Sequence, residues 1–393
     1  MKKPLVIMIV AGEASGDSHA ADLVNEIREI EPKTAFFGSA GPKMRAAGVE
    51  AIVEADILSV VGISAVARSV PMFLKVMNKL KEAARQRKPD AVILVDFPEF
   101  NLKLARSLKK QGMRVIYYIS PQIWAWRKYR IRTIRRWVDL VVSILPFEKD
   151  WYASQGVDKV IQVGNPLIGK VGSSISKSEF CAKHGLRPDL PIIALLPGSR
   201  SKEIARILPE MLEASSRVAE TDPTIQFVIA LAPNRSVNEV SSAQKKVVTQ
   251  GKELTAHLTC VQGETYDALN AADAAAVASG TATLEAGILG TPLVVVYKVP
   301  KFDYQLFRRF VDVPHIGLIN LIAGKRLARE LIQDEFTADT LADELRRLLE
   351  PKVNIELREK LRRLTEQLQQ GNSGLRASDV VLEFVRSKGR SNE

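Results

Sequence analysis

The chain has 393 residues, of which 46% are hydrophobic and 26% charged, and its formal net charge is +11 at pH 7. This length exceeds what one small core needs, so we expect an ordinary globular protein of two domains. The positive charge favours an anionic partner such as a nucleotide, a phosphorylated substrate or an acidic lipid surface. We find no aromatic-rich RNA signature and no recognition-helix pattern, which argues against nucleic acid. Cys181 and Cys260 lack metal-type spacing and indicate buried reduced thiols in a cytoplasmic protein.

The N-terminal apolar run, Leu5–Val10, passes directly into a glycine turn. This pattern predicts a buried strand rather than an export signal. No segment reaches the roughly 18 uninterrupted apolar residues of a membrane-spanning helix. We therefore expect any contact with a membrane to be made from the side.

Strand-like apolar runs alternate with helical patterns along most of the chain, which predicts parallel sheets with crossover helices. The expected strands of the first half are Leu5–Val10, Ala91–Val95, Val115–Ile119, Leu140–Ile144 and Val160–Val163. Those of the second half are Ile192–Leu196, Gln226–Ala230, Leu258–Val261, Ala274–Ala278 and Leu293–Tyr297. We predict an α/β protein of two doubly wound Rossmann-like domains that face each other across a cleft, with ligands at the carboxyl ends of the strands.

A polar stretch at 169–190 separates the two sets of strands. We place the boundary there and expect domains at 1–168 and 169–350. The remaining residues, 351–393, read as a helical tail that packs back on the first domain or is exchanged with a second subunit in a homodimer.

The first strand ends in AGEASGD, residues 11–17. Two glycines four positions apart let the backbone approach a ligand closely. The turn lacks the GxGxxG spacing of dinucleotide sites, and its two carboxylates would repel a pyrophosphate. We interpret Glu13 and Ser15 as contacts for sugar hydroxyls. The alternative is a glycine turn in which Asp17 or its neighbour caps a helix that begins near His19.

The strand 91–95 runs into DFPEFN, so Asp96 emerges at the carboxyl end of a buried parallel strand. A partly desolvated carboxylate there suits a general base that takes a proton from an alcohol. Glu99 and Asn101 are expected to orient the loop or to cap the next helix. The alternative is that Asp96 is itself only a helix cap.

The segment SPQIWAWR, residues 120–127, follows another expected strand, and six of the ten residues at 127–136 are basic. A solvated helix face is the usual explanation of such a run. Here aromatic and basic groups stand together, which suits a phosphate-bearing amphiphile or an interface. The candidate contacts are Ser120, Gln122, Trp124 and Arg127.

Residues 57–80 are apolar and rich in small side chains, are interrupted by Gly62 and Pro71, and turn basic at Lys75 and Lys79. A pair of core helices explains this composition. The functional interpretation is an apolar surface that receives acyl chains or rests on a bilayer.

Arg200 closes LPGSR at another strand end, where its guanidinium could pair with a diphosphate. The chain has no Asp-x-Asp, so a metal-bridged diphosphate is not indicated.

The motif SGTATLE begins at Ser279, directly after the apolar run 274–278. The pattern predicts a helix N-terminus at the carboxyl edge of a sheet, where Gly280 and Thr281 would bind an anion such as phosphate. Glu285 lies about one turn into the helix and could accept hydrogen bonds from a ribose diol. The alternative is an ordinary N-capped helix.

Together these segments resemble the lipid-A-disaccharide synthase family. The motifs that carry the resemblance are AGEASGD, AGPKMRAAGV, VDFPEFN, SPQIWAWR, LPFEKDWY, LPGSR, SGTATLEA and, from Asn320, NLIAGKRLARELIQ. The resemblance implies the two-Rossmann (GT-B) fold and a metal-independent inverting glycosyltransferase without a cofactor. Such an enzyme transfers 2,3-diacylglucosamine from UDP to the 6-hydroxyl of 2,3-diacylglucosamine 1-phosphate.

The resemblance also assigns roles. Asp96 would be the base, while Glu13, Ser15 and the tryptophan loop would line the acceptor side. The residues that would hold UDP are Arg200, Ser279, Gly280, Thr281, Glu285 and Asn320. Members of this family are peripheral on the cytoplasmic face of the inner membrane, and dimers with exchanged C-terminal segments occur among them.

Two positions depart from the family pattern. Asn165 stands where a histidine is common, which makes a catalytic histidine there untenable. Ile319 replaces the proline that usually precedes the Asn320 motif, and we expect this change to loosen the nucleotide loop.

Other readings remain open on the sequence. Another two-Rossmann enzyme acting on UDP-sugars, such as a peptidoglycan-type transferase or a UDP-N-acetylglucosamine epimerase, would share the SGTATLE helix but would not explain SPQIWAWR. A non-catalytic lipid or nucleotide binder could retain the fold. An NAD-dependent oxidoreductase is disfavoured because GxGxxG followed by an acidic residue is missing from both halves.

Overall fold

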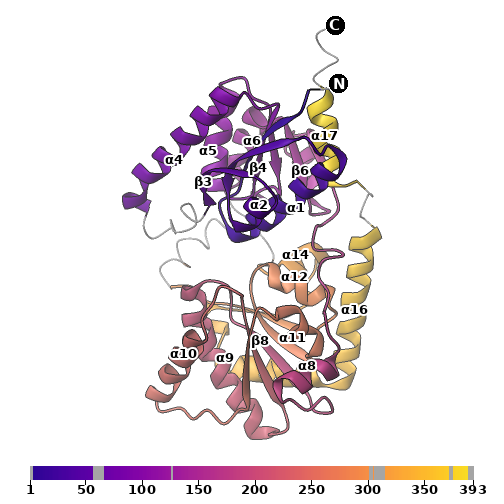
Figure 1. Ribbon diagram of the computed structural model, residues 1–393. Coiled ribbons are helices and arrows are strands. Elements are labelled where there is room, and N and C mark those ends of the chain that lie inside the picture. Colours follow the sequence, from indigo (N-terminus) through magenta and orange to yellow (C-terminus); the bar gives the residue numbers. More distant parts are fainter. Residues whose placement is uncertain are drawn as a thin grey trace. The chain divides into compact units, whose positions relative to one another are not determined.

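A computed structural model describes residues 3–55, 66–124, 127–300, 304, 315–370 and 375–387 (Figure 1). The chain divides into two compact units. Unit 1 comprises residues 1–166 together with 371–393, and unit 2 is the continuous stretch 167–370.

The described residues of unit 1 form one sheet of seven parallel strands in the order β3-β2-β1-β4-β5-β6-β7. The strands are β1 (Val6–Val10), β2 (Ala35–Ala40), β3 (Glu50–Glu54), β4 (Ala91–Val95), β5 (Val115–Tyr118), β6 (Leu140–Ser143) and β7 (Val160–Gln162). The order reverses between β1 and β4, so the loops after these two strands flank the switch point, where open parallel sheets bind their ligands.

Helices cover both faces of this sheet (Figure 1). They are α1 (Ala14–Ile30), α2 (Pro42–Ala46), α4 (Val66–Arg87), α5 (Pro98–Lys109), η2 (Lys128–Arg130), α6 (Ile131–Trp137), α7 (Glu148–Ser154) and α17 (Ala377–Arg386). Side chains alternate along β1, where Met8 and Val10 pack against α4 and α5, and Ile7 and Ile9 pack against α1 and α17. This period of two explains why the central strands are continuously apolar.

Unit 2 contains, among its described residues, a parallel sheet of six strands in the order β10-β9-β8-β11-β12-β13. The strands are β8 (Ile192–Leu196), β9 (Gln226–Leu231), β10 (Leu258–Gln262), β11 (Ala274–Ala278), β12 (Leu293–Tyr297) and β13 (Glu330–Ile332). The helices are α8 (Lys177–His184), α9 (Ser201–Thr221), α10 (Val237–Thr249), α11 (Thr265–Ala271), α12 (Thr281–Ile288), α14 (Leu318–Ala323), η3 (Gln333–Glu335), α15 (Ala338–Leu349) and α16 (Pro351–Gln370). The switch point of this sheet lies between β8 and β11.

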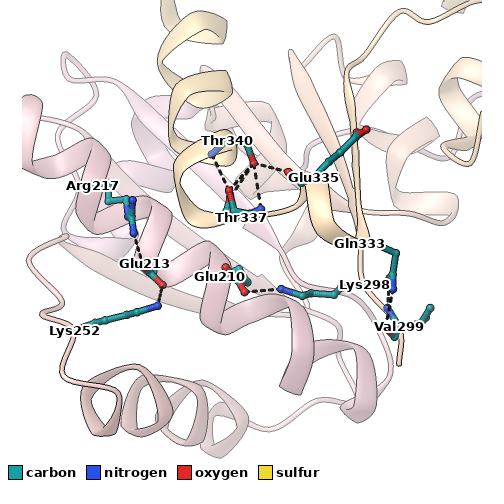
Figure 2. Close-up of polar contacts among 10 residues, drawn as sticks. All are labelled: Glu210, Glu213, Arg217, Lys252, Lys298, Val299, Gln333, Glu335, Thr337 and Thr340. Carbon is teal, nitrogen blue, oxygen red and sulfur yellow. Dashed lines mark hydrogen bonds and ion pairs between the residues drawn. The ribbon is translucent and has the colours of Figure 1, made fainter. Parts of the chain in front are cut away.

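Ion pairs with Lys252 and Lys298 fix α9 on neighbouring segments, and a further pair with Arg217 lies within the helix (Figure 2). Glu213 is buried and accepts hydrogen bonds from Arg217 and Lys252, while Glu210 pairs with Lys298 just beyond β12. Burial acts to raise the pKa of Glu213, but the bonds from Lys252 and Arg217 together bring it below its ordinary value. The amide of Gln333 exchanges two hydrogen bonds with the backbone of Val299, at 2.7 and 3.0 Å (Figure 2).

The parallel α/β architecture and all ten expected strands are confirmed. The edge strands β3 and β13 and the interior strand β2 are not predicted. Strands β3 and β13 are short and carry charged residues, and β2 is interrupted by Gly38. Helix α1 begins at Ala14, earlier than predicted, and Pro71 lies inside α4 instead of ending a helix. The rest of the apolar segment, residues 56–65, lies outside the described part of the chain.

The C-terminal helices divide between the units, so the expected tail at 351–393 is not one packing segment. Helix α16 packs on α12 and α15 of unit 2, whereas α17 packs on α1 and β6 of unit 1. Arg114 anchors α17 by donating to the carbonyls of Phe384 and Val385, and its guanidinium lies 3.8 Å from the centre of the Phe384 ring. In the described part of the chain, no helix has the length and apolarity needed to cross a bilayer.

Candidate functional site

The loops after β1 and β4 touch at the switch point of unit 1. A Cβ atom placed on Gly12 would lie 2.4 Å from Cδ1 of Phe97, so only glycine fits there without moving the ring. The sequence pattern predicted that this glycine lets the backbone approach a ligand. The close approach is instead made by an aromatic side chain, which couples the two loops.

The residues after β1 differ in exposure, since Glu13 and Ser15 are accessible and Asp17 is buried. Glu13 is the half-buried N-cap residue of α1, and Ser15 is exposed in its first turn. Asp17 is buried and accepts hydrogen bonds from the backbone N–H groups of Gly41 and Lys43, at 2.8 and 2.9 Å. Asp17 therefore caps α2, not its own helix as the alternative reading proposed.

Asp96 lies directly beyond β4 with its backbone in the left-handed region, at a φ of 46°. Its N–H donates to the carbonyl of Tyr118, and its own carbonyl accepts from Oη of Tyr117 at 2.7 Å and from Nδ2 of Asn101 at 2.8 Å. The backbone is thus fixed while the side chain remains half-buried. Burial, and next the nearby charge of Asp96, raise the pKa of Tyr117 well above its ordinary value. As expected, Asn101 orients this loop.

Backbone strain is concentrated at this edge. Phe97 and Ile119 follow β4 and β5 and also have positive φ values, of 49° and 57°. A β-branched residue in this region is an outlier that persists only where the surroundings hold it. Such residues are typical of functional sites, because the fold must supply the free energy that keeps them in place.

The loop after β5 carries predicted contacts that do not all face outward. Gln122 is exposed, but Ser120 and Trp124 are buried, and both donate to Oε1 of Glu148, at 2.8 and 3.0 Å. Ser120 and Trp124 therefore support the loop, which corrects their assignment as direct acceptor contacts. The sequence interpretation missed Glu148, although it lies within the quoted motif LPFEKDWY.

Arg127 ends this loop and has a positive φ of 58°. Its guanidinium donates to Oε1 of Glu99 at 2.6 Å, and buried Arg130 binds the same oxygen. Glu99 thus connects the segment after β4 to η2, which carries Arg130 and follows Arg127. Residues 125–126, which include the second tryptophan, lie outside the described part.

In unit 2, Arg200 is exposed and is the N-cap residue of α9, directly after the β8 loop. Its guanidinium lies 3.3 Å from the carboxylate of Glu203. A Cβ on Gly198 would lie 3.7 Å from the Cβ of Ala278, so the loops after β8 and β11 are neighbours. The structure therefore brings Arg200 and the SGTATLE segment to one edge of one sheet.

Helix α12 begins as predicted, with Gly280 as its N-cap residue. Gly280 and Thr281 are exposed, so the first N–H groups of the helix are open to an anion. Ser279 is half-buried, and its hydroxyl donates to the carbonyl of Ile316 at 2.9 Å. The same hydroxyl keeps its acceptor lone pairs.

Glu285 lies one turn further along α12 and accepts a hydrogen bond from Oη of Tyr266 at 3.0 Å. Burial raises the pKa of Glu285, and the bond from Tyr266 opposes this rise. The carboxylate is half-buried and can accept a further hydrogen bond.

Asn320 is 0% exposed, and its amide is fully used inside the protein. Its Nδ2 donates to the carbonyl of Ala328 and to Oε1 of Glu330, and its Oδ1 accepts from the N–H groups of Leu327 and Ala328. This contradicts a direct contact between the Asn320 amide and UDP. Buried Glu330 also accepts from the N–H groups of Ile316 and Gly317, so the Asn320–Glu330 pair holds the loop whose Ile316 carbonyl accepts from the Ser279 hydroxyl.

The two departures from the family pattern are both buried. Ile319 packs on α12, where a Cβ on Gly287 would lie 2.3 Å from its Cδ1. Its N–H, which a proline would lack, lies 3.4 Å from Oγ1 of Thr283. Ile319 therefore contributes contacts between α14 and α12, and the looser nucleotide loop stays a prediction.

In the described residues, no group of three or more His, Cys, Asp or Glu side chains is placed to hold a metal ion.

Comparison with known proteins gives one consistent family. The profile of the lipid-A-disaccharide synthetase family matches residues 7–384. A lipid-A-disaccharide synthase from Myxococcus xanthus is 44% identical over 386 residues, which cover 98% of this chain and 99% of the relative. Solved structures agree in fold at much lower identity. The calicheamicin glycosyltransferase aligns with a TM-score of 0.61 at 15% identity, over 99% of this chain and 100% of that one. The UDP-GlcNAc 2-epimerase from Neisseria meningitidis aligns with a TM-score of 0.62 at 14% identity, over 98% and 100%.

Proposed function

The chain belongs to the lipid-A-disaccharide synthase family, and we propose that the strand ends of its two units divide the work of that reaction. It is a glycosyltransferase with the GT-B fold that condenses UDP-2,3-diacylglucosamine with 2,3-diacylglucosamine 1-phosphate. The family match along nearly the whole chain carries this assignment, since the fold alone is shared with epimerases.

Unit 1 binds the acceptor and activates its 6-hydroxyl. Asp96 takes the hydroxyl proton as the oxygen attacks the anomeric carbon, which inverts the configuration there. The fixed backbone of Asp96 supports this role, because a general base must hold its position relative to the proton that it removes. Glu13, Ser15, Gln122 and Arg127 bind the acceptor around it.

Unit 2 binds UDP and receives the negative charge that develops on the leaving diphosphate. The exposed N-terminus of α12 at Gly280 and Thr281, the hydroxyl of Ser279 and the guanidinium of Arg200 supply that stabilisation without a metal or cofactor. Glu285 accepts hydrogen bonds from the ribose. Asn320 serves this site only by fixing the loop at Ile316, whose carbonyl accepts from the Ser279 hydroxyl.

The protein is peripheral on the cytoplasmic face of the inner membrane, and α4 makes the contact. Met72 and Leu74 on this helix are 44% and 54% exposed, and Lys75 and Lys79 beside them are exposed as well. Apolar side chains flanked by lysines are typical of helices that lie in an anionic lipid interface. Co-sedimentation with vesicles of anionic lipid should weaken in the double variant Met72→Ser, Leu74→Ser.

Two chains associate by exchange of the C-terminal segment. Helix α17 supports this proposal, because it belongs to unit 1 while the helix before it belongs to unit 2. Analytical ultracentrifugation should show a homodimer, and a chain ending at residue 374 should be monomeric.

The deciding experiment measures UDP release from UDP-2,3-diacylglucosamine in EDTA, with and without 2,3-diacylglucosamine 1-phosphate. We expect release that requires the acceptor, survives the chelator and yields the tetra-acylated disaccharide phosphate. Inactivity with this pair together with turnover of UDP-N-acetylglucosamine would assign the chain to the epimerase or peptidoglycan-type class.

A further inference from the structure

The carboxylate of Glu148 is the most deeply buried acid of the unit 1 site region. The residue is 1% exposed at the start of α7, yet no cation pairs with it in the described part of the chain. Instead it accepts hydrogen bonds from the side chains of Ser120, Trp124 and Ser143. Burial raises the pKa of Glu148, and these hydrogen bonds oppose the rise.

Such an arrangement costs free energy and calls for an explanation other than packing. An apolar side chain would fill the same space without the desolvation penalty of a carboxylate. A carboxylate, however, can accept several hydrogen bonds at once from different directions. Its donors here come from the loop after β5 and from the end of β6, so it joins two strand ends to one helix.

The loop that Glu148 holds is the one that carries predicted acceptor contacts. Ser120 and Trp124 bracket exposed Gln122, and the Trp124 ring lies edge-on to Phe147 with their centres 4.9 Å apart. Ser120 directly follows Ile119, whose left-handed backbone needs support from its surroundings. One residue earlier, the carbonyl of Tyr118 accepts the N–H of Asp96.

We propose that Glu148 is a positioning residue for acceptor binding, which holds the strained loop 119–124 and, through Tyr118, the backbone of Asp96 in the geometry that the reaction needs. This inference rests on the proposed function, because it assumes that unit 1 binds the acceptor. Glu148 itself does not touch the substrate.

Steady-state kinetics of Glu148→Ala, Glu148→Gln and Trp124→Phe test the proposal, with both substrates varied. Glu148→Ala should lower kcat/KM for the acceptor roughly tenfold or more and leave the Kd for UDP within about twofold. Glu148→Gln should recover most of the loss, because its amide oxygen can accept from Ser120 and Trp124 while its NH₂ donates to Ser143. Trp124→Phe keeps the ring but removes one donor, so its loss should be smaller.

Asp139→Asn is the matched control. Asp139 accepts from the N–H of Val115 at the opposite end of β5 and pairs with Lys109, so it supports the same strand away from the reactive edge. This variant should lower the melting temperature without changing the acceptor KM. If Glu148→Ala behaves in the same way, or if Glu148→Gln is as damaging as Glu148→Ala, Glu148 is structural and the proposal is wrong.

Two further variants distinguish a loss of acceptor binding from a failure of Glu148→Ala to fold. Should Glu148→Ala fail to fold, Trp124→Phe and Ser120→Ala each remove one hydrogen bond of the same network, and an unchanged acceptor KM in both would overturn the proposal. Failure of the proposed function would appear differently, as absence of transfer by the unaltered protein.

Discussion

The two units present the same sheet edge with different chemistry. At the reactive edge of unit 1, three residues other than glycine take up left-handed backbone, namely Asp96, Phe97 and Ile119. At that of unit 2, the left-handed position of the β8 loop is a glycine, Gly198, and the β11 loop ends in an exposed helix N-terminus. In unit 1, therefore, part of the folding free energy offsets the strain that places side chains at the sheet edge. Unit 2 instead presents backbone N–H groups without such strain. The first arrangement suits the proton transfer that we propose for unit 1, and the second suits the diphosphate that we propose for unit 2.

The largest effect should come from Asp96→Asn. If unit 1 supplies the base, this isosteric change lowers kcat by roughly 10³-fold. The Kd for UDP, measured by calorimetry, should remain unchanged because the proposed UDP site lies on unit 2. Residual turnover near the wild-type rate would show that the strained edge serves another purpose.

Asn320→Ala should act on stability. The change leaves the N–H groups of Leu327 and Ala328 and the carboxylate of Glu330 without their amide partner inside the protein, at a cost of about 3 kcal/mol. Urea denaturation measures this loss. If the variant has normal stability but no longer binds UDP, the Asn320 amide contacts UDP directly and the structural role assigned to it here is wrong.

Arg200→Ala tests the anion site that we propose for unit 2. Loss of a charge-assisted hydrogen bond to phosphate should weaken UDP binding by roughly 10–100-fold. Arg206→Ala, further along α9, is the control and should bind UDP normally. Equal losses in both variants would indicate a general effect of charge.

Gly12→Ala tests whether the packing of Phe97 on Gly12 in unit 1 positions Asp96. The added methyl group collides with the Phe97 ring and must displace the Asp96 loop, so kcat should fall about tenfold. UDP affinity should not change. A variant with wild-type kcat would show that the Gly12–Phe97 contact does not position the base.

The smallest effect concerns the pH dependence of stability. Since burial raises the folded-state pKa of Glu148 above its unfolded value, protonation favours the folded state, and this contribution is lost as the pH rises through the folded pKa. The unfolding free energy of Glu148→Gln should therefore exceed that of the wild type most at neutral pH. The difference should narrow toward pH 4.5, and thermal melts at several pH values measure it. A difference that widens on acidification would contradict the raised pKa.

The helices and strands that could be predicted from the sequence are those set by the pattern of neighbouring residues. Continuous apolar runs such as Ala91–Val95 identify strands buried on both faces, and SGTATLE marks a helix start by its glycine and hydroxyls. The roles of Glu148 and Glu330 depend on donors that the fold brings together, some of them 28 residues distant along the chain. The Gly12–Phe97 contact has the same origin. Asn320 shows the opposite error, because a motif marks a residue as important without saying whether its amide faces a ligand or the core.

The division of the C-terminal helices has a consequence for synthesis on the ribosome. Unit 2 is continuous, but one hydrophobic core of unit 1 includes Val381 and Val385, near the end of the chain. Domains generally fold as they emerge, the N-terminal one first. Helix α1 can cover its part of this face early, but the part of the N-terminal sheet near β6 that α17 covers stays exposed until the whole of unit 2 has been made. The nascent chain therefore completes its second unit before its first, and the exposed face of the first sheet is the surface that a chaperone would bind during translation.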